Sequence, residues 1–224
     1  MSKVKITGNA SGTGVLTVTA PDTDVDREIT LPDAAGTLLT SNGDGSSLTG
    51  VGGAWTLINS QVANDDASLT QTGLDSTYDT YAIVLADLVP ATDAANPWLR
   101  CGDSGGIDSG ASDYEYHTGN VRATSASYAA LVSDGAAQML LAPTIGSAGG
   151  EGFGGGTYLS RPGDGSVRPF FHGTFCGMNE ADRLLGSAFT GQRQTVITLD
   201  RVQFLFSSGN ITSGRMTVYG IAHA

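Results

Sequence analysis

The sequence divides near Gly53 into two stretches of different character. Residues 29–53 read ITLPDAAGTLLTSNGDGSSLTGVGG, in which small residues and glycine dominate. From Trp55 onward, apolar and polar residues alternate over most of the chain. Such alternation has the period of a β-strand, whereas stretches rich in glycine and serine behave as flexible linkers. The join therefore predicts an extension with a linker over residues 1–53 and a folded domain over residues 54–224.

Composition favours an all-β domain. The chain has 224 residues, of which 40% are hydrophobic, and this is enough to bury one core next to an extension. Its 32 glycines and its many Ser, Thr, Asp and Val residues favour strands and turns over helix interiors. We expect an antiparallel β-sandwich of jelly-roll-like type, with at most a single helical turn near residues 179–185.

Segments with the strand pattern follow one another after the join. They are residues 55–61, 67–71, 78–88, 98–101, 114–121, 138–142, 156–160, 167–176, 186–190, 195–206 and 214–222. Residues 81–85 (YAIVL) are apolar without interruption and should form a central strand. Residues 202, 204 and 206 should share one face of their strand. Before the join, residues 3–7 and 15–20 look like short strands with too few large apolar side chains to fold alone.

Charge and hydropathy argue against two kinds of partner. The formal net charge is −11, and an acidic chain repels phosphate backbones, so we expect no nucleic-acid partner. No stretch approaches the ~20 consecutive apolar residues of a membrane-spanning helix, so we expect no membrane insertion. Residues 1–5 (MSKVK) lack the apolar run of a signal peptide, which favours a protein made in the cytoplasm.

No metal or other cofactor is expected. Asp22, Asp24 and Asp26 alternate as in a calcium-binding loop, but Arg27 and Asp33 occupy the positions where such a loop needs Gly and Glu. We interpret this stretch as a solvated turn. The two cysteines are expected to be buried free thiols, with one disulfide bridge as the less favoured alternative: Cys101 and Cys176.

Candidate catalytic residues are few. Neither His117 nor His172 has a Ser, Asp or Cys at a recognisable catalytic spacing, so each is interpreted as a structural strand histidine. Four acidic residues also lie close together in the sequence: Asp103, Asp108, Asp113 and Glu115. Their glycine-rich context indicates turns, not the paired carboxylates of a glycosidase. We therefore expect no enzymatic activity.

One glycine-rich stretch is a candidate binding loop. Residues 146–156 (GSAGGEGFGGG) lack the Lys-Ser/Thr ending of a phosphate-binding loop and are interpreted as a long mobile loop centred on Phe153. Residues 142–164 are the longest stretch without a clear core strand, and exposed loops on a rigid sandwich often carry binding residues. The alternatives are that residues 142–164 form a flexible connection without a binding role, or that they pack against a neighbouring subunit.

Five residues are the candidates for surface binding: Tyr114, Tyr116, Phe153, Tyr158 and Arg161. If the four aromatic side chains among them are exposed together with Trp98, they favour glycan binding, because aromatic faces suit sugar rings. If the same side chains are buried, they favour a purely structural role.

Several stretches resemble proteins of tailed-bacteriophage virions. Residues 29–51 are similar to the N-terminal part of tail-fibre and related virion proteins. Residues 74–81, 99–114 and 208–221 resemble small β-sandwich modules of such proteins. These are fold motifs, so the resemblance assigns no functional residue. It implies a homotrimer in the virion that attaches by its N-terminal end and exposes its C-terminal domain.

The resemblance leads to two expected functions. The first is a short tail fibre or receptor-binding appendage, made in the host cytoplasm, whose sandwich meets a host surface glycan or protein. The second is a capsid decoration or head-fibre protein with a purely structural role. In both, residues 1–53 bind other virion proteins and become ordered only in the assembly.

Overall fold

The computed structural model describes residues 11, 13, 54–123 and 125–222. The chain divides into two compact units, Met1–Ser47 and Leu48–Ala224. Almost every expectation for the extension and linker lies outside the described residues, including the short strands at 3–7 and 15–20 and the acidic turn. The description below concerns the second unit.

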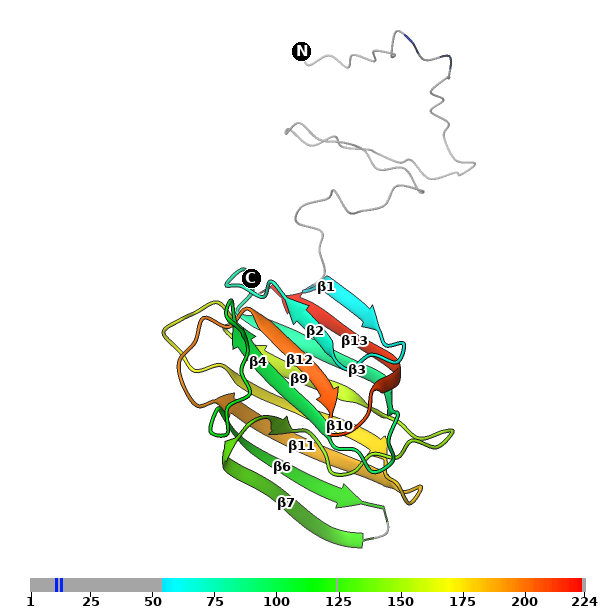
Figure 1. Cartoon of the computed structure of the whole chain (residues 1–224). Coiled ribbons are helices and arrows are strands. Elements are labelled where there is room, and N and C mark those ends of the chain that lie inside the picture. The colour runs from blue at the N-terminus through cyan, green and yellow to red at the C-terminus, as the bar shows by residue number, and fades with distance from the viewer. Residues whose placement is uncertain (1–10, 12, 14–53, 124, 223–224) are drawn as a thin grey trace, which may run out of the picture. The chain divides into compact units, whose positions relative to one another are not determined.

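This unit is an all-β sandwich of two antiparallel sheets (Figure 1). The larger sheet has eight strands, in the spatial order β1 (Trp55–Val62), β13 (Ile211–Ile221), β3 (Thr80–Pro90), β9 (Phe153–Ser160), β10 (Phe170–Met178), β11 (Leu184–Arg193), β6 (Tyr114–Arg122) and β7 (Ser125–Ala136). The smaller sheet has the order β2 (Leu69–Thr72), β12 (Arg201–Phe206), β4 (Pro97–Asp103) and β5 (Gly106–Ile107), and β8 (Met139–Leu140) also pairs with β4. The prediction of a β-sandwich is confirmed.

The hydrophobic core lies between the two sheets. The larger sheet contributes buried side chains such as Ile83 and Phe189, and β12 contributes Val202, Phe204 and Phe206 from one face, as predicted. β3 lies between β13 and β9, so the prediction of a central strand at residues 81–85 is also confirmed. The aromatic side chains of the two sheets meet in the middle, where the Phe153 and Phe204 rings stack with their centroids 6.2 Å apart.

The expected helical turn near residues 179–185 is wrong. This stretch is the turn of the β10–β11 hairpin, and the described residues contain no helix. The side-chain oxygen of Asn179 accepts hydrogen bonds from the backbone N–H groups of Ala181 (3.1 Å) and Arg183 (2.9 Å). Asp182 adopts a left-handed φ of 54°. Asn and Asp suit both roles in a tight turn, which explains the choice of residues here.

The glycine-rich stretch is not a mobile loop over its whole length. β9 begins at Phe153, includes the three following glycines and lies between β3 and β10. Gly155 has a φ of 136°, and a Cβ atom at this position would overlap the carbonyl oxygen of Thr174 on β10. Glycine is therefore required for these two strands to approach each other. The choice of residues 142–164 as a stretch without a core strand is wrong, because β9 is central.

Candidate binding surface

Two of the five predicted surface residues, Tyr114 and Phe153, are fully buried, so their prediction as surface residues is wrong. The Tyr114 hydroxyl accepts a hydrogen bond from the backbone N–H of Cys101 (2.9 Å) and lies 2.7 Å from the carbonyl oxygen of the same residue. Burial raises the pKa of Tyr114 above its ordinary value. Phe153 stacks on Phe175 with ring centroids 5.2 Å apart. Both residues join the sheets instead of facing a ligand.

The other three candidates lie in different settings. Tyr116 is half-buried against the core, and burial raises its pKa. Arg161 is exposed, has a left-handed φ of 45° and forms a 3.7 Å ion pair with Asp164. Tyr158 is exposed in the middle of β9. The structure thus does not bring the five predicted residues together, and Trp98 lies elsewhere, half-buried on the smaller sheet.

The acidic cluster is held by an arginine. Arg193, at the end of β11, forms ion pairs with Asp108 (2.8 Å) and Asp113 (3.0 Å). Its side chain is only 12% exposed, so these contacts are shielded from water. Asp103 accepts a hydrogen bond from the backbone N–H of Gly105 in the β4–β5 turn (2.8 Å). These contacts agree with the interpretation of the cluster as turn chemistry.

The two cysteines are unpaired, but they differ in exposure. Cys101 on β4 is buried, and burial raises the pKa of its thiol to about 12. Cys176 on β10 is exposed, so the expectation that both thiols are buried is wrong for Cys176. Cys176 alternates with inward-facing residues of β10 and therefore projects from the outer face of the larger sheet.

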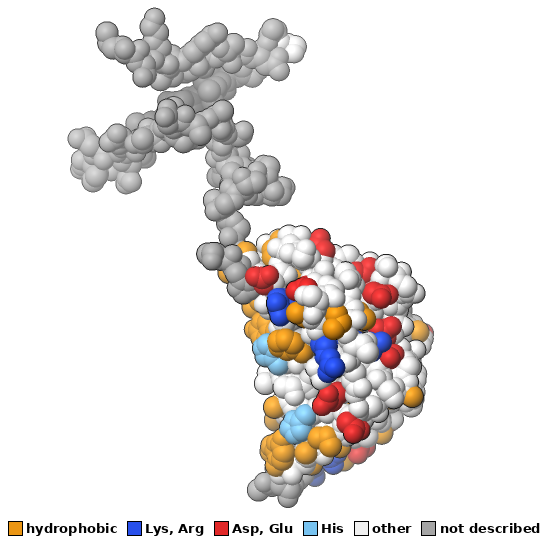
Figure 2. Space-filling model, turned by 90° about the vertical axis from the view of Figure 1, so that its left-hand side faces the viewer, with side chains coloured by type: hydrophobic (Ala, Val, Ile, Leu, Met, Phe, Trp, Pro, Cys, Tyr) orange, Lys and Arg blue, Asp and Glu red, His pale blue; other side chains and the backbone are white. Residues whose placement is uncertain are grey.

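That outer face, the side of the larger sheet turned away from the smaller sheet, collects exposed apolar residues. Nine large hydrophobic side chains project from it: Trp55, Leu57, Val62, Val121, Tyr128, Val132, Tyr158, Phe170 and Leu184. Among the described residues, one other exposed large hydrophobic residue, Val196, lies elsewhere. In Figure 2, hydrophobic and histidine side chains gather along the left-hand edge of the sandwich. Large exposed apolar patches generally mark binding surfaces.

The pairing of the strands arranges the centre of this face in two rows. In the first, which we call the aromatic row, neighbouring strands place side by side the residues Ala82, Tyr158, His172, Thr190 and His117. In the second, which we call the small row, the same strands place side by side Val84, Gly156, Thr174, Ala188 and Gly119. Because every second residue of a strand faces the same side, the rows are neighbours on one surface. The small row is consequently a trough beside the aromatic row.

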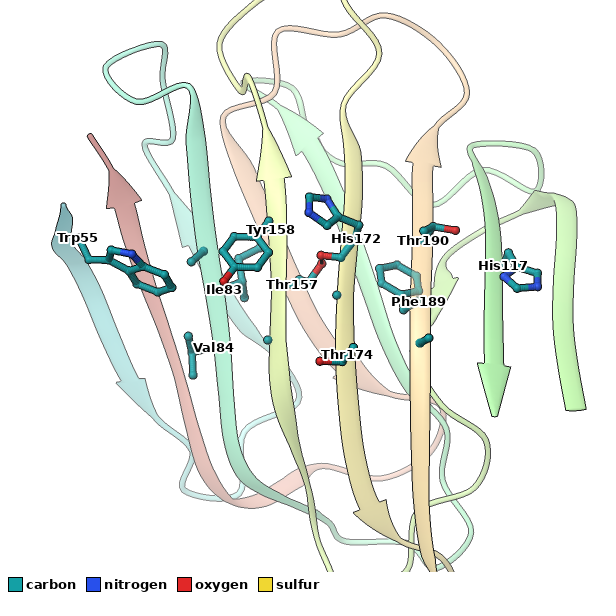
Figure 3. Close-up of a pocket in the computed structure, with 14 residues that line it drawn as sticks. Trp55, Ile83, Val84, His117, Thr157, Tyr158, His172, Thr174, Phe189 and Thr190 are labelled. Carbon is teal, nitrogen blue, oxygen red and sulfur yellow. Dashed lines mark hydrogen bonds between the residues drawn. The ribbon is translucent and has the colours of Figure 1, made fainter. Parts of the chain in front are cut away.

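A depression of about 530 Å³ lies over these rows (Figure 3). Trp55 stands at the β1 end, where its ring is 6.1 Å from that of Tyr158 at an angle of 80°. The Tyr158 and His172 rings stack with centroids 5.4 Å apart. The described residues that line the depression include no Asp, Glu, Lys or Arg. It is therefore an open site with aromatic, hydroxyl and imidazole groups and no carboxylate or strong base.

A second hollow of about 820 Å³ adjoins the first on the same face. The two share His117, His172 and Thr190. The second also contains charged groups, and here the Gln192 side-chain amide donates a 2.6 Å hydrogen bond to a Glu115 carboxylate oxygen. The outer face thus changes from uncharged at strands β3, β9 and β10 to acidic toward β6 and β7.

Sequence reasoning missed this surface. It treated His117, His172 and Tyr158 separately, because the register that makes them neighbours joins strands far apart in the chain. One signal was present: the outward positions of β9 and β11 are Gly, Tyr, Ser, Leu, Ala, Thr and Gln, with no charged residue among them. An ordinary solvent-facing sheet surface carries more charged residues.

In residues 54–123 and 125–222, no group of three or more His, Cys, Asp or Glu residues is placed to hold a metal ion. Nor does any helix in this part of the chain have the length and apolar character needed to cross a membrane.

Fold and surface together define a class: a β-sandwich domain whose larger sheet has many exposed hydrophobic residues on its outer face. No protein-family model, no curated protein and no solved structure matches this chain.

Proposed function

We propose that this protein is a non-catalytic attachment protein of a bacteriophage virion, a short tail fibre or receptor-binding appendage. In this proposal residues 1–53 anchor the chain to other virion proteins, three copies associate, and the sandwich faces the host surface. The observation that carries it is the outer face of the larger sheet, which displays nine of the ten exposed large hydrophobic residues in the described part of the chain.

The physical reason is the cost of exposing such a face to water. Each square ångström of apolar surface removed from water contributes ~25 cal/mol, so a partner that covers part of the face gains binding free energy. Two of the acidic residues that lie close together in the sequence, Asp108 and Asp113, are both paired with Arg193. A binding role accounts for these features better than catalysis does. The resemblance of residues 29–51 and of three later stretches to phage virion proteins supports the same class.

The test is to find the protein on particles. Virions are purified from a culture that expresses the chain, digested for mass spectrometry, and labelled with gold-conjugated antibodies raised against the full chain. We expect its peptides in the particles and gold at the tail. Purified full-length protein, added in excess, should also block adsorption of the phage. Absence of the protein from purified particles would overturn the proposal.

A capsid decoration or head-fibre protein is the alternative. The burial of Tyr114 and Phe153 favours it, because these residues serve the fold and not a ligand. The same labelling separates the two: gold over the capsid, together with unimpaired adsorption in the presence of excess protein, assigns the chain to the structural role.

A further inference from the structure

We propose that the depression on the outer face binds an uncharged carbohydrate chain, which lies across strands β3, β9, β10 and β11 with its sugar rings against Trp55 and Tyr158. The inference deepens the proposed function, on which it rests, by assigning the ligand class and the residues that bind it. The depression has a volume of about 530 Å³, which falls within the ~300–1,000 Å³ of small-ligand sites.

Aromatic side chains supply the apolar part of the site. The C–H bonds on one face of a pyranose ring form an apolar surface that packs against an aromatic ring. Trp55 and Tyr158 are 44% and 36% exposed, although both contact other rings. Trp55 leans on Tyr219 (5.6 Å between centroids) and Tyr158 on His172, so the rings are held in place before a ligand arrives. Such preorganisation lowers the entropy cost of binding.

Hydrogen-bonding groups lie beside the aromatic rings in both rows of the depression. Thr174 and Thr190 offer hydroxyls, and His172 and His117 offer imidazole nitrogens, all on the lining of the depression (Figure 3). These groups both donate and accept, as sugar hydroxyls do. With no Asp, Glu, Lys or Arg among the described lining residues, nothing there offers a strong charge to a uronate, sialate or phosphate group. The ligand class is therefore a neutral sugar.

Small residues give the trough its shape. Gly156 lies between Val84 and Thr174, Ala188 lies on the other side of Thr174, and toward β7 the Tyr128 side chain covers Gly119. Neighbouring strands lie ~4.8 Å apart, so the open part from β3 to β11 spans about 14 Å. That length accommodates more than one sugar ring of a linear chain.

Two other occupants fit this surface less well. An extended peptide needs partners for its own backbone, but the backbone groups of β3, β9, β10 and β11 are already used in the ladders of the sheet. In a contact with a second copy, the largest apolar anchors generally lie at the centre. Here Leu57, Val132 and Leu184 lie on strands near the edges of the sheet or at strand ends, and the centre is hollow.

The experiment uses Trp55 as its own reporter. The chain has two tryptophans, so the full-length Trp98→Phe variant reports fluorescence from Trp55 alone. It is titrated with neutral linear trisaccharides (cellotriose, maltotriose, mannotriose and tri-N-acetylchitotriose) and with the charged probes glucuronic acid, N-acetylneuraminic acid and glucose 6-phosphate. We expect a saturable fluorescence change with at least one neutral trisaccharide and none with the charged probes.

A matched pair of valine substitutions locates the site. Gly156→Val fills the floor of the trough, where a Cβ atom meets nothing nearer than a carbonyl oxygen at 3.6 Å. Gly186→Val is the control on the same face, since a Cβ atom there has nothing within 4 Å and Gly186 does not line the depression. We expect Gly156→Val to weaken binding roughly tenfold or more and Gly186→Val to change it less than about twofold. Circular dichroism and melting temperatures verify that both variants are folded.

Three outcomes would overturn the inference: no binding of any neutral trisaccharide, preference for a charged probe, or equal losses in the two valine variants. Sedimentation of the same proteins tests whether a second copy of the chain occupies this face instead. If Gly156→Val dissociates an oligomer that Gly186→Val leaves intact, the face is an interface between copies and the sugar site is wrong. The location of the protein on virions is measured separately, so any of these results leaves the proposed function standing.

Discussion

The two faces of the larger sheet are made by the same strands and yet differ in almost every physical respect. Along β10, Phe171 and Phe175 point inward and are buried, while His172, Thr174 and Cys176 point outward and are exposed. The inner face is filled by large aliphatic and aromatic side chains. The outer face combines small residues with a few standing rings, which leaves a trough. Alternation alone thus identifies a strand, but the sizes of the residues on each side decide which side packs and which side binds.

Neighbouring glycines show the same contrast most directly. Gly155 faces inward, where β10 leaves no room for a side chain, and Gly156 faces outward, where there is room for one. One glycine is needed for the fold, and the other shapes a surface. The predictions below compare inner with outer positions and run from the largest expected effect to the smallest.

Removing a ring should cost most on the inner face. Phe153→Ala leaves a cavity between Phe175 and Phe204 and is expected to lower the free energy of unfolding by about 3–5 kcal/mol. Phe170→Ala on the outer face, where the ring is 47% exposed, should change it by less than about 0.5 kcal/mol. Chemical denaturation of the full chain measures both. Equal losses would mean that the outer face is also a packed core.

Adding a methyl group should distinguish the two glycines. Gly155→Ala combines a φ of 136° with an overlap on Thr174, so we expect a loss of roughly 2–4 kcal/mol. Gly156→Ala should change the free energy of unfolding by less than about 1 kcal/mol, since the new Cβ atom makes an ordinary contact. Melting temperatures of the two variants provide the comparison. A larger loss for Gly156→Ala would contradict the assignment of inner and outer positions.

Removing a mostly buried ion pair should likewise lower the free energy of unfolding more than removing an exposed one. Arg193→Met removes charged hydrogen bonds from Asp108 and Asp113 at a mostly buried position and should cost about 1.5–3 kcal/mol. The control, Arg161→Met, breaks an exposed 3.7 Å pair with Asp164 and should cost less than about 1 kcal/mol. Urea midpoints at low and high salt measure both. If high salt lowers the urea midpoint of the wild-type protein as much as Arg193→Met does, the Arg193 ion pairs are exposed to solvent.

The smallest predicted effect concerns the two thiols. Burial raises the pKa of Cys101 to about 12, whereas an unfolded cysteine ionises near ~8.5. The contribution of the Cys101 thiol to the free energy of unfolding is therefore complete below the pKa of the unfolded state. It declines as the pH rises from there toward the pKa of the folded state. Between pH 8 and pH 10 we expect a loss of about 2 kcal/mol in the free energy of unfolding. Cys101→Ala should remove most of this dependence and Cys176→Ala none of it, as measured by urea unfolding at each pH.

The fold was largely predictable because its signal is local. Each strand segment predicted after the join overlaps a strand of the sandwich, and residues 81–85 lie in a central strand as expected. β7 was missed because its sequence, SASYAALVSDGA, is rich in alanine, which favours strands little. The start of β9 was missed because glycine normally weakens strands, and the close approach to β10 that requires it is a tertiary feature.

The candidate site was not predictable in the same way. The five residues proposed from sequence were chosen for their type and for their place in supposed loops, and Tyr158 alone of the five lines the depression on the outer face. Its partners His172, Thr190 and His117 belong to three other strands. Only the register of a complete sheet makes them neighbours. Tyr114 and Phe153 misled because aromatic side chains serve cores more often than surfaces.

Trp55 opens β1, so the fold and the proposed sugar site begin at the same residue. The chain also leaves the sandwich beside it, since the backbone N–H of Ala222 donates a 2.9 Å hydrogen bond to the carbonyl oxygen of Ala54. Tension on the chain at Ala54 would accordingly reach the Trp55 ring before any residue of the inner core. In the proposed sugar complex, a pull on the chain at Ala54 would therefore act on a ligand contact first.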